Sequence, residues 1–116
     1  ELIERLNMKI FSVSDVRENG EKKCVDETLN LLSDCDLIYI SLDVDSLDPE
    51  ISDGTGTSVE NGFKVTEVKK ILSYLSNSSK FRCLEITEVN PTLDTKGNMM
   101  SEVALEILEE TVFKIQ

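Results

Sequence analysis

Three carboxylates lie within six positions at the end of an apolar run, in the nonapeptide SLDVDSLDP at residues 41–49. Residues 36–42 are typical of a buried β-strand, because branched and aromatic side chains fill both of its faces. Alternation along a strand puts Asp43 and Asp45 on one side of the chain, at the carboxyl end where open α/β sheets bind ligands. Two like charges placed there repel each other, and a hard divalent cation compensates them best.

The same carboxylates also fit a second interpretation, in which they shape a turn. Aspartate side chains accept hydrogen bonds from nearby backbone amides, and Asp48 followed by Pro49 favours a turn. The chain is acidic throughout, with 23 Asp and Glu residues against 12 Lys and Arg residues. From this motif alone, metal binding and turn formation both stay open.

A further carboxylate follows a later strand. Residues 81–87 have the pattern of a strand, and Glu88 comes directly after them. If this strand runs parallel to residues 36–42, Glu88 lies level with the aspartate motif. Glu85 lies three residues earlier and faces the other side of a regular strand, which indicates either a structural role or a role in supporting the site residues.

The elements that must position these side chains alternate between strand and helix. Hydrophobic periodicity predicts strands at 8–13, 36–42 and 81–87, and helices at 21–33, 66–76 and 101–115. This βαβαβα order predicts an α/β fold with a parallel sheet and right-handed crossovers. Three strands alone would make a poor sheet, because both of its edges stay exposed.

Composition narrows the classes of function. The net charge of −11 argues against nucleic acid and against anionic membrane surfaces as partners. The three Cys residues lack CxxC spacing, which argues against a disulfide framework or a zinc site. Because the chain has neither an apolar run of transmembrane length nor a signal-peptide pattern, we expect a cytoplasmic protein of one domain.

Several motifs, taken together, resemble those of the ureohydrolase family, the arginases and agmatinases. SLDVDSLDP matches the family pattern SxDxDxxDP, GTGT at 54–57 matches its GTGTP-type loop, and EVNPTLD at 88–94 matches a block typical of arginases. The resemblance spans nearly the whole chain but only the carboxyl-terminal portion of the family's longer sequences. It implies that residues 1–116 are the carboxyl-terminal fragment of a single arginase-like α/β domain with a doubly wound parallel sheet, whose upstream half is absent.

The resemblance also implies a site with two Mn²⁺ ions and a guanidinium pocket. Asp43 matches the carboxylate that bridges both metals, and Asp45 matches a ligand to one of them. Thr57 matches a residue that lines the pocket, and Glu88 matches the catalytic carboxylate that pairs with the guanidinium through charge-assisted hydrogen bonds. The chain contains no His, so the family's His residues and its Asp-x-His-x-Asp stretch are expected upstream of Glu1.

The implied reaction is manganese-dependent hydrolysis of L-arginine to urea and ornithine by a metal-generated hydroxide. Agmatinase, which acts on decarboxylated arginine, is one alternative, and an inactive arginase-like regulatory or assembly subunit is another. The implied partners are a small guanidinium substrate and further copies of the chain, in a trimer or hexamer. The isolated chain is expected to be inactive, since it supplies two carboxylate ligands and no imidazole.

Three residues of the glycine-bearing loop at 49–61 depart from the family pattern. Ser58 stands where Pro is common, Asn61 replaces the first residue of a Gly-Gly pair, and Asp53 stands where small or apolar residues are usual. A long loop in a small domain indicates a functional site. We therefore expect a loop of altered shape or mobility, with consequences for the substrate more than for the metals.

Overall fold

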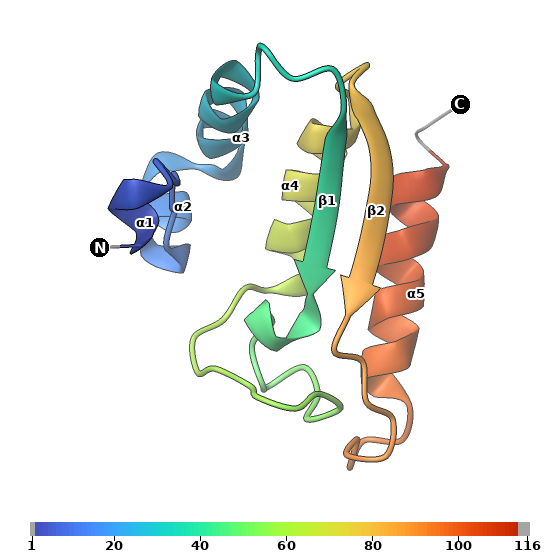
Figure 1. The fold of residues 1–116 in the computed structure, drawn as a ribbon. Helices are drawn as coiled ribbons and strands as arrows, with labels where there is room; N and C mark the ends of the chain where they lie inside the picture. Colours follow the sequence, from blue (N-terminus) through green and yellow to red (C-terminus); the bar gives the residue numbers. More distant parts are fainter. Residues whose placement is uncertain (1, 114–116) are drawn as a thin grey trace.

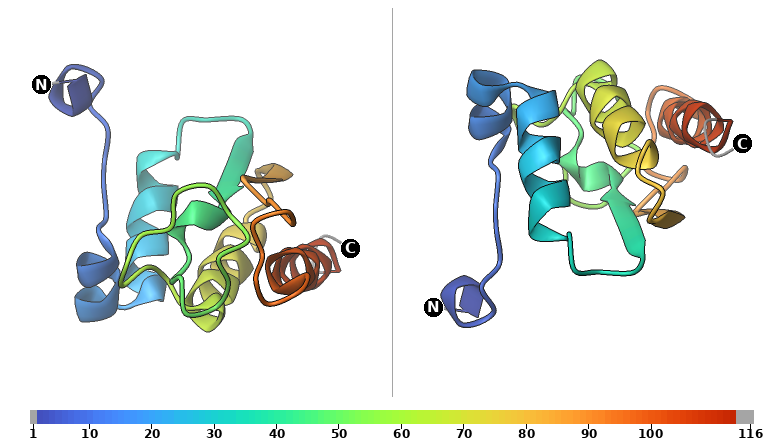
Figure 2. Two further views of the ribbon diagram at one scale, coloured as in Figure 1. Left: turned by 90° about the horizontal axis from the view of Figure 1, so that it is seen from below. Right: turned by 90° about the horizontal axis from the view of Figure 1, so that it is seen from above.

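A computed structural model describes residues 2–113, and two parallel strands lie at its centre (Figure 1). Strand β1 (Ile38–Asp43) pairs with β2 (Phe81–Thr87), and the predicted parallel sheet of an α/β fold is confirmed. Helices α4 (Val65–Ser76) and α5 (Met99–Val112) lie on the same face of this sheet (Figure 2). The remaining elements are helices α1 (Leu2–Arg5), α2 (Val13–Asn19) and α3 (Glu21–Leu31), and the short 3₁₀ helix η1 (Val44–Ser46).

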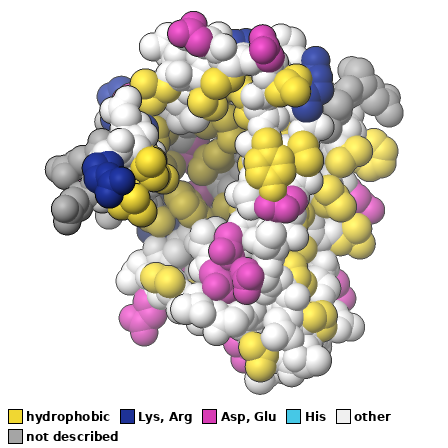
Figure 3. Space-filling model, in the orientation of Figure 1, with side chains coloured by type: hydrophobic (Ala, Val, Ile, Leu, Met, Phe, Trp, Pro, Cys, Tyr) yellow, Lys and Arg dark blue, Asp and Glu magenta, His cyan; other side chains and the backbone are white. Residues whose placement is uncertain are grey.

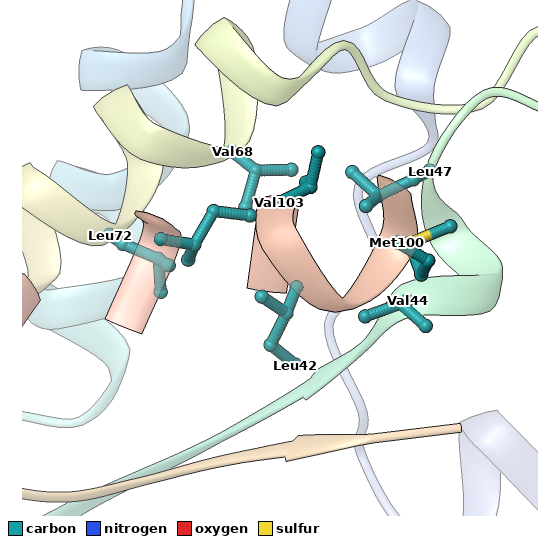
Figure 4. Close-up of a cluster of buried hydrophobic side chains, with 8 residues drawn as sticks. Leu42, Val44, Leu47, Val68, Leu72, Met100 and Val103 are labelled. Carbon is teal, nitrogen blue, oxygen red and sulfur yellow. The ribbon is translucent and has the colours of Figure 1, made fainter. Parts of the chain in front are cut away.

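The hydrophobic core fills the space between the sheet and the helices α4 and α5 (Figure 4). Leu42 contributes from β1, and the apolar stripes of α4 and α5 meet it, as their helical periodicity predicts. The buried members of the cluster are Leu42, Val44, Leu47, Val68, Leu72, Met100, Val103 and Ile107. The chain on both sides of Asp45 therefore packs into the core, which fixes the position of that carboxylate.

Within residues 2–113, no helix covers the opposite face of the sheet at Tyr39, Ser41 and Glu85. Tyr39 is 56% exposed, and Ser41 and Glu85 are exposed beside it. Glu85 accepts a hydrogen bond from the Ser41 hydroxyl at 2.8 Å, and a hydrogen bond from Tyr39 is the largest cause of its lowered pKa. This placement agrees with the structural role predicted for Glu85.

The strand predicted at 8–13 is wrong. Residues 8–12 belong to neither a helix nor a strand, and α2 begins at Val13. A capping box starts this helix, because the Ser12 hydroxyl accepts from the Asp15 amide while the Asp15 carboxylate accepts from the Ser12 amide. A strand also needs a neighbour for its backbone groups, and within residues 2–113 β1 and β2 pair only with each other.

The other predicted elements are present with shifted ends. The predicted helix 21–33 ends at Leu31, helix 66–76 begins one residue earlier at Val65, and strand 36–42 runs from Ile38 to Asp43. The last helix begins at Met99, and the final residues of its predicted range lie outside the described residues. Strand 81–87 is found where it was predicted.

Arg17 ties α2 to the start of α4 and to the loop before it. Its guanidinium donates to both carboxylate oxygens of Glu67, at 2.9 and 3.0 Å, and to the Gly62 carbonyl at 2.9 Å. Glu67 in turn accepts from the Lys64 amide at 2.8 Å and thereby caps α4. The ion pair with Arg17 is the main reason that the pKa of Glu67 is lowered.

No helix within the described part of the chain is both long and apolar enough to cross a membrane.

Truncating Ile107 to alanine should destabilise the fold far more than truncating Leu105 in the same helix. Ile107 is 0% exposed whereas Leu105 is 55% exposed. The cavity left by Ile107→Ala should cost about 2–5 kcal/mol, and the surface change about 0.5 kcal/mol or less. Urea unfolding followed by circular dichroism measures both, and equal midpoints for the two variants would contradict this core assignment.

Candidate metal and substrate site

Parallel pairing brings the candidate carboxylates to one edge of the sheet. Asp43 is the last residue of β1 and lies opposite Thr87, the last residue of β2. Glu88 follows directly, and Asp45 lies in η1 after β1. On the surface, acidic side chains gather where the two strands end, below a hollow between α3 and β1 (Figure 3). The predicted alignment of the two strand ends is confirmed.

Asp43 shapes a turn and still keeps an oxygen for a ligand. Its Oδ1 accepts from the Asp45 amide at 2.8 Å and caps η1, while its carbonyl accepts from the Ser46 hydroxyl at 2.6 Å. Within residues 2–113 nothing donates to its Oδ2. The turn and metal interpretations of the motif are therefore compatible in one side chain.

Asp45 is held by the GTGT loop. Its Oδ1 accepts from the Thr55 hydroxyl and from the Thr57 amide, the latter at 3.2 Å. Its Oδ2, like that of Asp43, has no donor in the described part of the chain. The contact from Thr57 comes from the backbone, and the Thr57 residue itself is exposed.

Asp48 has the structural role that its position next to Pro49 predicts. Its Oδ1 accepts from the Glu50 amide at 2.9 Å, the same local geometry that Asp43 makes with Asp45. Its own amide donates to the Phe63 carbonyl at 2.9 Å, which joins the two ends of the loop.

Thr55 is a candidate site residue that the sequence motifs did not reveal. It is 5% exposed, and its hydroxyl lies within hydrogen-bonding reach of both Asp45 Oδ1 and the Glu88 carbonyl, 3.0 Å away. The only signal in the sequence is a hydroxyl residue between two glycines of a functional loop. That signal does not say which threonine of GTGT points inward.

Glu88 has a backbone conformation that few side chains adopt. Its φ is +67°, in the left-handed region, which costs a non-glycine residue about 1–2 kcal/mol. Two hydrogen bonds flank this residue. The Thr55 hydroxyl lies within hydrogen-bonding reach of its carbonyl, and the Asn90 amide donates to the Gly54 carbonyl at 2.8 Å. A Cβ placed on Gly56 would lie 3.9 Å from Glu88 Oε2, so the carboxylate reaches over the GTGT loop.

Asp53 and Asp94 join the two loops of the site. Asp53 accepts from the Thr95 amide and hydroxyl, at 2.8 and 2.6 Å. Asp94 accepts from the Met100 amide at 2.8 Å, at the start of α5, and also from the hydroxyl of Ser52. These hydrogen bonds lower the pKa of both carboxyl groups, chiefly through the Thr95 hydroxyl for Asp53 and the Met100 amide for Asp94.

The loop packs too closely for side chains at two of its glycines. A Cβ on Gly54 would lie 2.7 Å from Asp94 Oδ2, and one on Gly62 would lie 2.7 Å from the backbone of Ser46. The departure at Asn61 fits the same loop, because its φ is +60° and Asn is among the residues that tolerate this region best.

The donor set suits part of a manganese site. Carboxylate oxygens are the ligands that hard cations such as Mn²⁺ accept, and Asp43 and Asp45 each hold one oxygen by hydrogen bonds while the other stays available. Among the described residues, no three His, Cys, Asp or Glu side chains come together in a group able to hold a metal. The fit is therefore to two ligands of a site and not to a complete coordination sphere.

The chain matches a family model, described as the arginase family, over residues 1–114. It therefore belongs to the arginase family.

Among its relatives, the arginase of Bacillus subtilis (strain 168) is 35% identical over 112 residues, which are 97% of this chain and 38% of the relative. The crystal structure of Helicobacter pylori arginase has a TM-score of 0.90 at 33% identity and covers 99% of this chain and 38% of its own. Formimidoylglutamase from Bacillus subtilis also reaches 0.90, at 28% identity over 98% of this chain and 36% of its own. The chain thus spans less than two fifths of the length of these proteins.

Replacing Thr95 with valine should raise the pKa of Asp53 towards its ordinary value of 3.8. The pKa of Asp53 is lower in the folded protein than in the unfolded chain. The hydrogen bonds from Thr95 therefore stabilise the fold at pH values above the ordinary pKa, and this stabilisation is lost as the pH falls through the lowered pKa. The change should weaken that contribution, because the Thr95 hydroxyl is the main cause of the shift.

Carboxyl ¹³C NMR of Asp53 during an acid titration measures this pKa in the wild type and in Thr95→Val. Thr92→Val is the matched control, since the Thr92 hydroxyl donates to Asn90 and does not contact Asp53. An Asp53 titration that is identical in the wild type and in Thr95→Val would refute the loop connection.

Proposed function

We propose that this chain works as the carboxyl-terminal part of an arginase-type ureohydrolase, which hydrolyses the guanidinium group of L-arginine to urea and ornithine with two Mn²⁺ ions. One observation carries the proposal: the Thr55 hydroxyl joins the carboxylate of the candidate metal ligand Asp45 to the backbone carbonyl of the candidate substrate residue Glu88. Membership of the arginase family supports the reaction class.

In this proposal each carboxylate has a separate task. Asp43 and Asp45 would hold the metals through the oxygens that no described residue occupies, and Asp43 would serve as a ligand to both ions. The metals, when bound, would lower the pKa of water and so supply hydroxide near neutral pH. Glu88 receives the planar guanidinium through charge-assisted hydrogen bonds, and Thr57 lines the pocket beside it. The chain lacks histidine, so the remaining ligands come from a region upstream of Glu1, and the chain alone is inactive.

The choice of L-arginine over agmatine depends on the residues after Glu88. The block EVNPTLD at 88–94 has the arginase form, and its Asn90 accepts from the amide and hydroxyl of Thr92 to form the turn beyond Glu88. The likeness to a formimidoylglutamase indicates that this fold serves more than one substrate, so the fold itself does not distinguish L-arginine from agmatine. Intact Asp43, Asp45 and Glu88 favour an enzyme over an inactive subunit. By the same family likeness we propose assembly as a homo-oligomer.

Replacing Asp43 with asparagine in the full-length enzyme should reduce its bound manganese to less than half. Asparagine keeps the oxygen that accepts from the Asp45 amide, so the turn survives while the ligand charge is lost. Asp48→Asn is the matched control, because Asp48 accepts from the Glu50 amide in the same way and is not a proposed ligand. Metal analysis after dialysis decides, and full manganese content in Asp43→Asn would remove Asp43 from the metal site.

Replacing Glu88 with glutamine should lower kcat/KM for L-arginine while leaving the metal content unchanged. The loss of a charge-assisted pair should cost about 2–4 kcal/mol, or roughly 30- to 1,000-fold. Glu85→Gln is the control, because Glu85 lies within β2 and bonds to Ser41 and Tyr39, not to a proposed ligand, so the substitution should change the rate little.

The same assay, run with arginine and agmatine in competition, identifies the substrate. We expect arginine to react faster. Faster hydrolysis of agmatine would overturn the arginase assignment and keep the ureohydrolase one, whereas an unchanged rate in Glu88→Gln would remove Glu88 from the substrate site.

A further inference from the structure

The buried Thr55 hydroxyl has two acceptors and a single proton to donate. Asp45 Oδ1 lies on one side of it and the Glu88 carbonyl on the other, 3.0 Å away. A hydroxyl can fully satisfy only one of these acceptors at a time. The side chain is 5% exposed, which leaves little access for solvent to supply a second donor.

The charge on Asp45 decides which acceptor receives that proton. A carboxylate is a stronger acceptor than a neutral carbonyl, so the proton lies towards Asp45 while that carboxylate is uncompensated. A cation at Asp45 withdraws electron density from Oδ1 and weakens it as an acceptor. The Thr57 amide still donates to Oδ1, so the Thr55 hydroxyl can turn towards Glu88 without leaving Asp45 unpaired.

A hydrogen bond to the Glu88 carbonyl affects the backbone conformation of Glu88. Glu88 has a φ of +67°, and in this unfavourable conformation its carboxylate lies near Gly56. A full hydrogen bond to the Glu88 carbonyl stabilises that conformation. Relaxation of Glu88 to an ordinary conformation would point the side chain elsewhere.

We propose that Thr55 is a positioning residue whose hydroxyl couples cation binding at Asp45 to the placement of the Glu88 carboxylate. The inference rests on the proposed function for the identity of the two ligands, Mn²⁺ and a guanidinium group. It adds that the two sites are energetically linked through a single side chain, and such a link acts equally in both directions.

The test measures the affinity of the full-length enzyme for methylguanidinium by calorimetry, with and without Mn²⁺. In Thr55→Val the manganese-loaded protein should bind methylguanidinium about 3- to 10-fold more weakly than the loaded wild type, as expected for one net hydrogen bond. Without manganese, the variant and the wild type should bind it equally. Thr55→Ser retains the hydroxyl and should restore the wild-type affinity.

Thr111→Val is the matched control. Thr111 is 3% exposed, and its hydroxyl donates to the Ile107 carbonyl at 2.8 Å within α5, away from the site. Thr111→Val should lower the stability of the protein as Thr55→Val does. It should leave the affinity for methylguanidinium unchanged, both with and without Mn²⁺.

A Thr55→Val affinity that equals the wild type with manganese, or that falls equally with and without manganese, would overturn the coupling while the proposed function stands. A wild type that binds neither Mn²⁺ nor methylguanidinium would overturn the proposed function and the coupling together.

Discussion

The parallel pairing of β1 with β2, which is regular from Tyr39 to Asp43, is the interaction on which the candidate site depends. It aligns Asp43 with Thr87, so that both strands end at the same edge of the sheet and the loops that follow them meet there. Antiparallel pairing would put Asp43 and Glu88 at opposite ends of the sheet. The core fixes the position of Asp43, because its neighbours Leu42 and Val44 are both buried in the cluster that α4 and α5 share.

Where the two loops meet, acidic side chains are mostly engaged in organising the backbone. Asp43, Asp48, Asp53 and Asp94 each accept hydrogen bonds from backbone amides. Hydrogen bonds stabilise an ionised carboxylate, and they lower the pKa values of Asp53, chiefly through the Thr95 hydroxyl, and of Asp94, chiefly through the Met100 amide. Few basic side chains take part in this region; Lys96 donates to the Glu50 carbonyl at 2.6 Å. An acidic edge built in this way suits cationic ligands, both metal ions and a guanidinium group.

The sheet also shows where the chain needs further structure. Parallel sheets are normally covered on both faces, yet here α4 and α5 cover one face, and Tyr39, Ser41 and Glu85 lie exposed on the other. The chain matches 38% of the length of the Bacillus subtilis arginase. An upstream region that covers this face and extends the sheet would complete both the fold and the coordination sphere proposed for the metals.

Local patterns in the sequence predicted most of the helices and strands and the candidate site residues. Periodicity predicted α4, α5 and both strands, because an apolar stripe must be buried whatever surrounds it. The motif SLDVDSLDP named Asp43 and Asp45, and ITEVNPTLD named Glu88. Only the tertiary structure decided that residues 8–12 form no strand, since pairing needs a neighbour that local sequence does not reveal. It also decided that Thr55, and not the side chain of Thr57, joins Asp45 to Glu88, because that contact links residues 33 apart whose meeting depends on how two loops fold together.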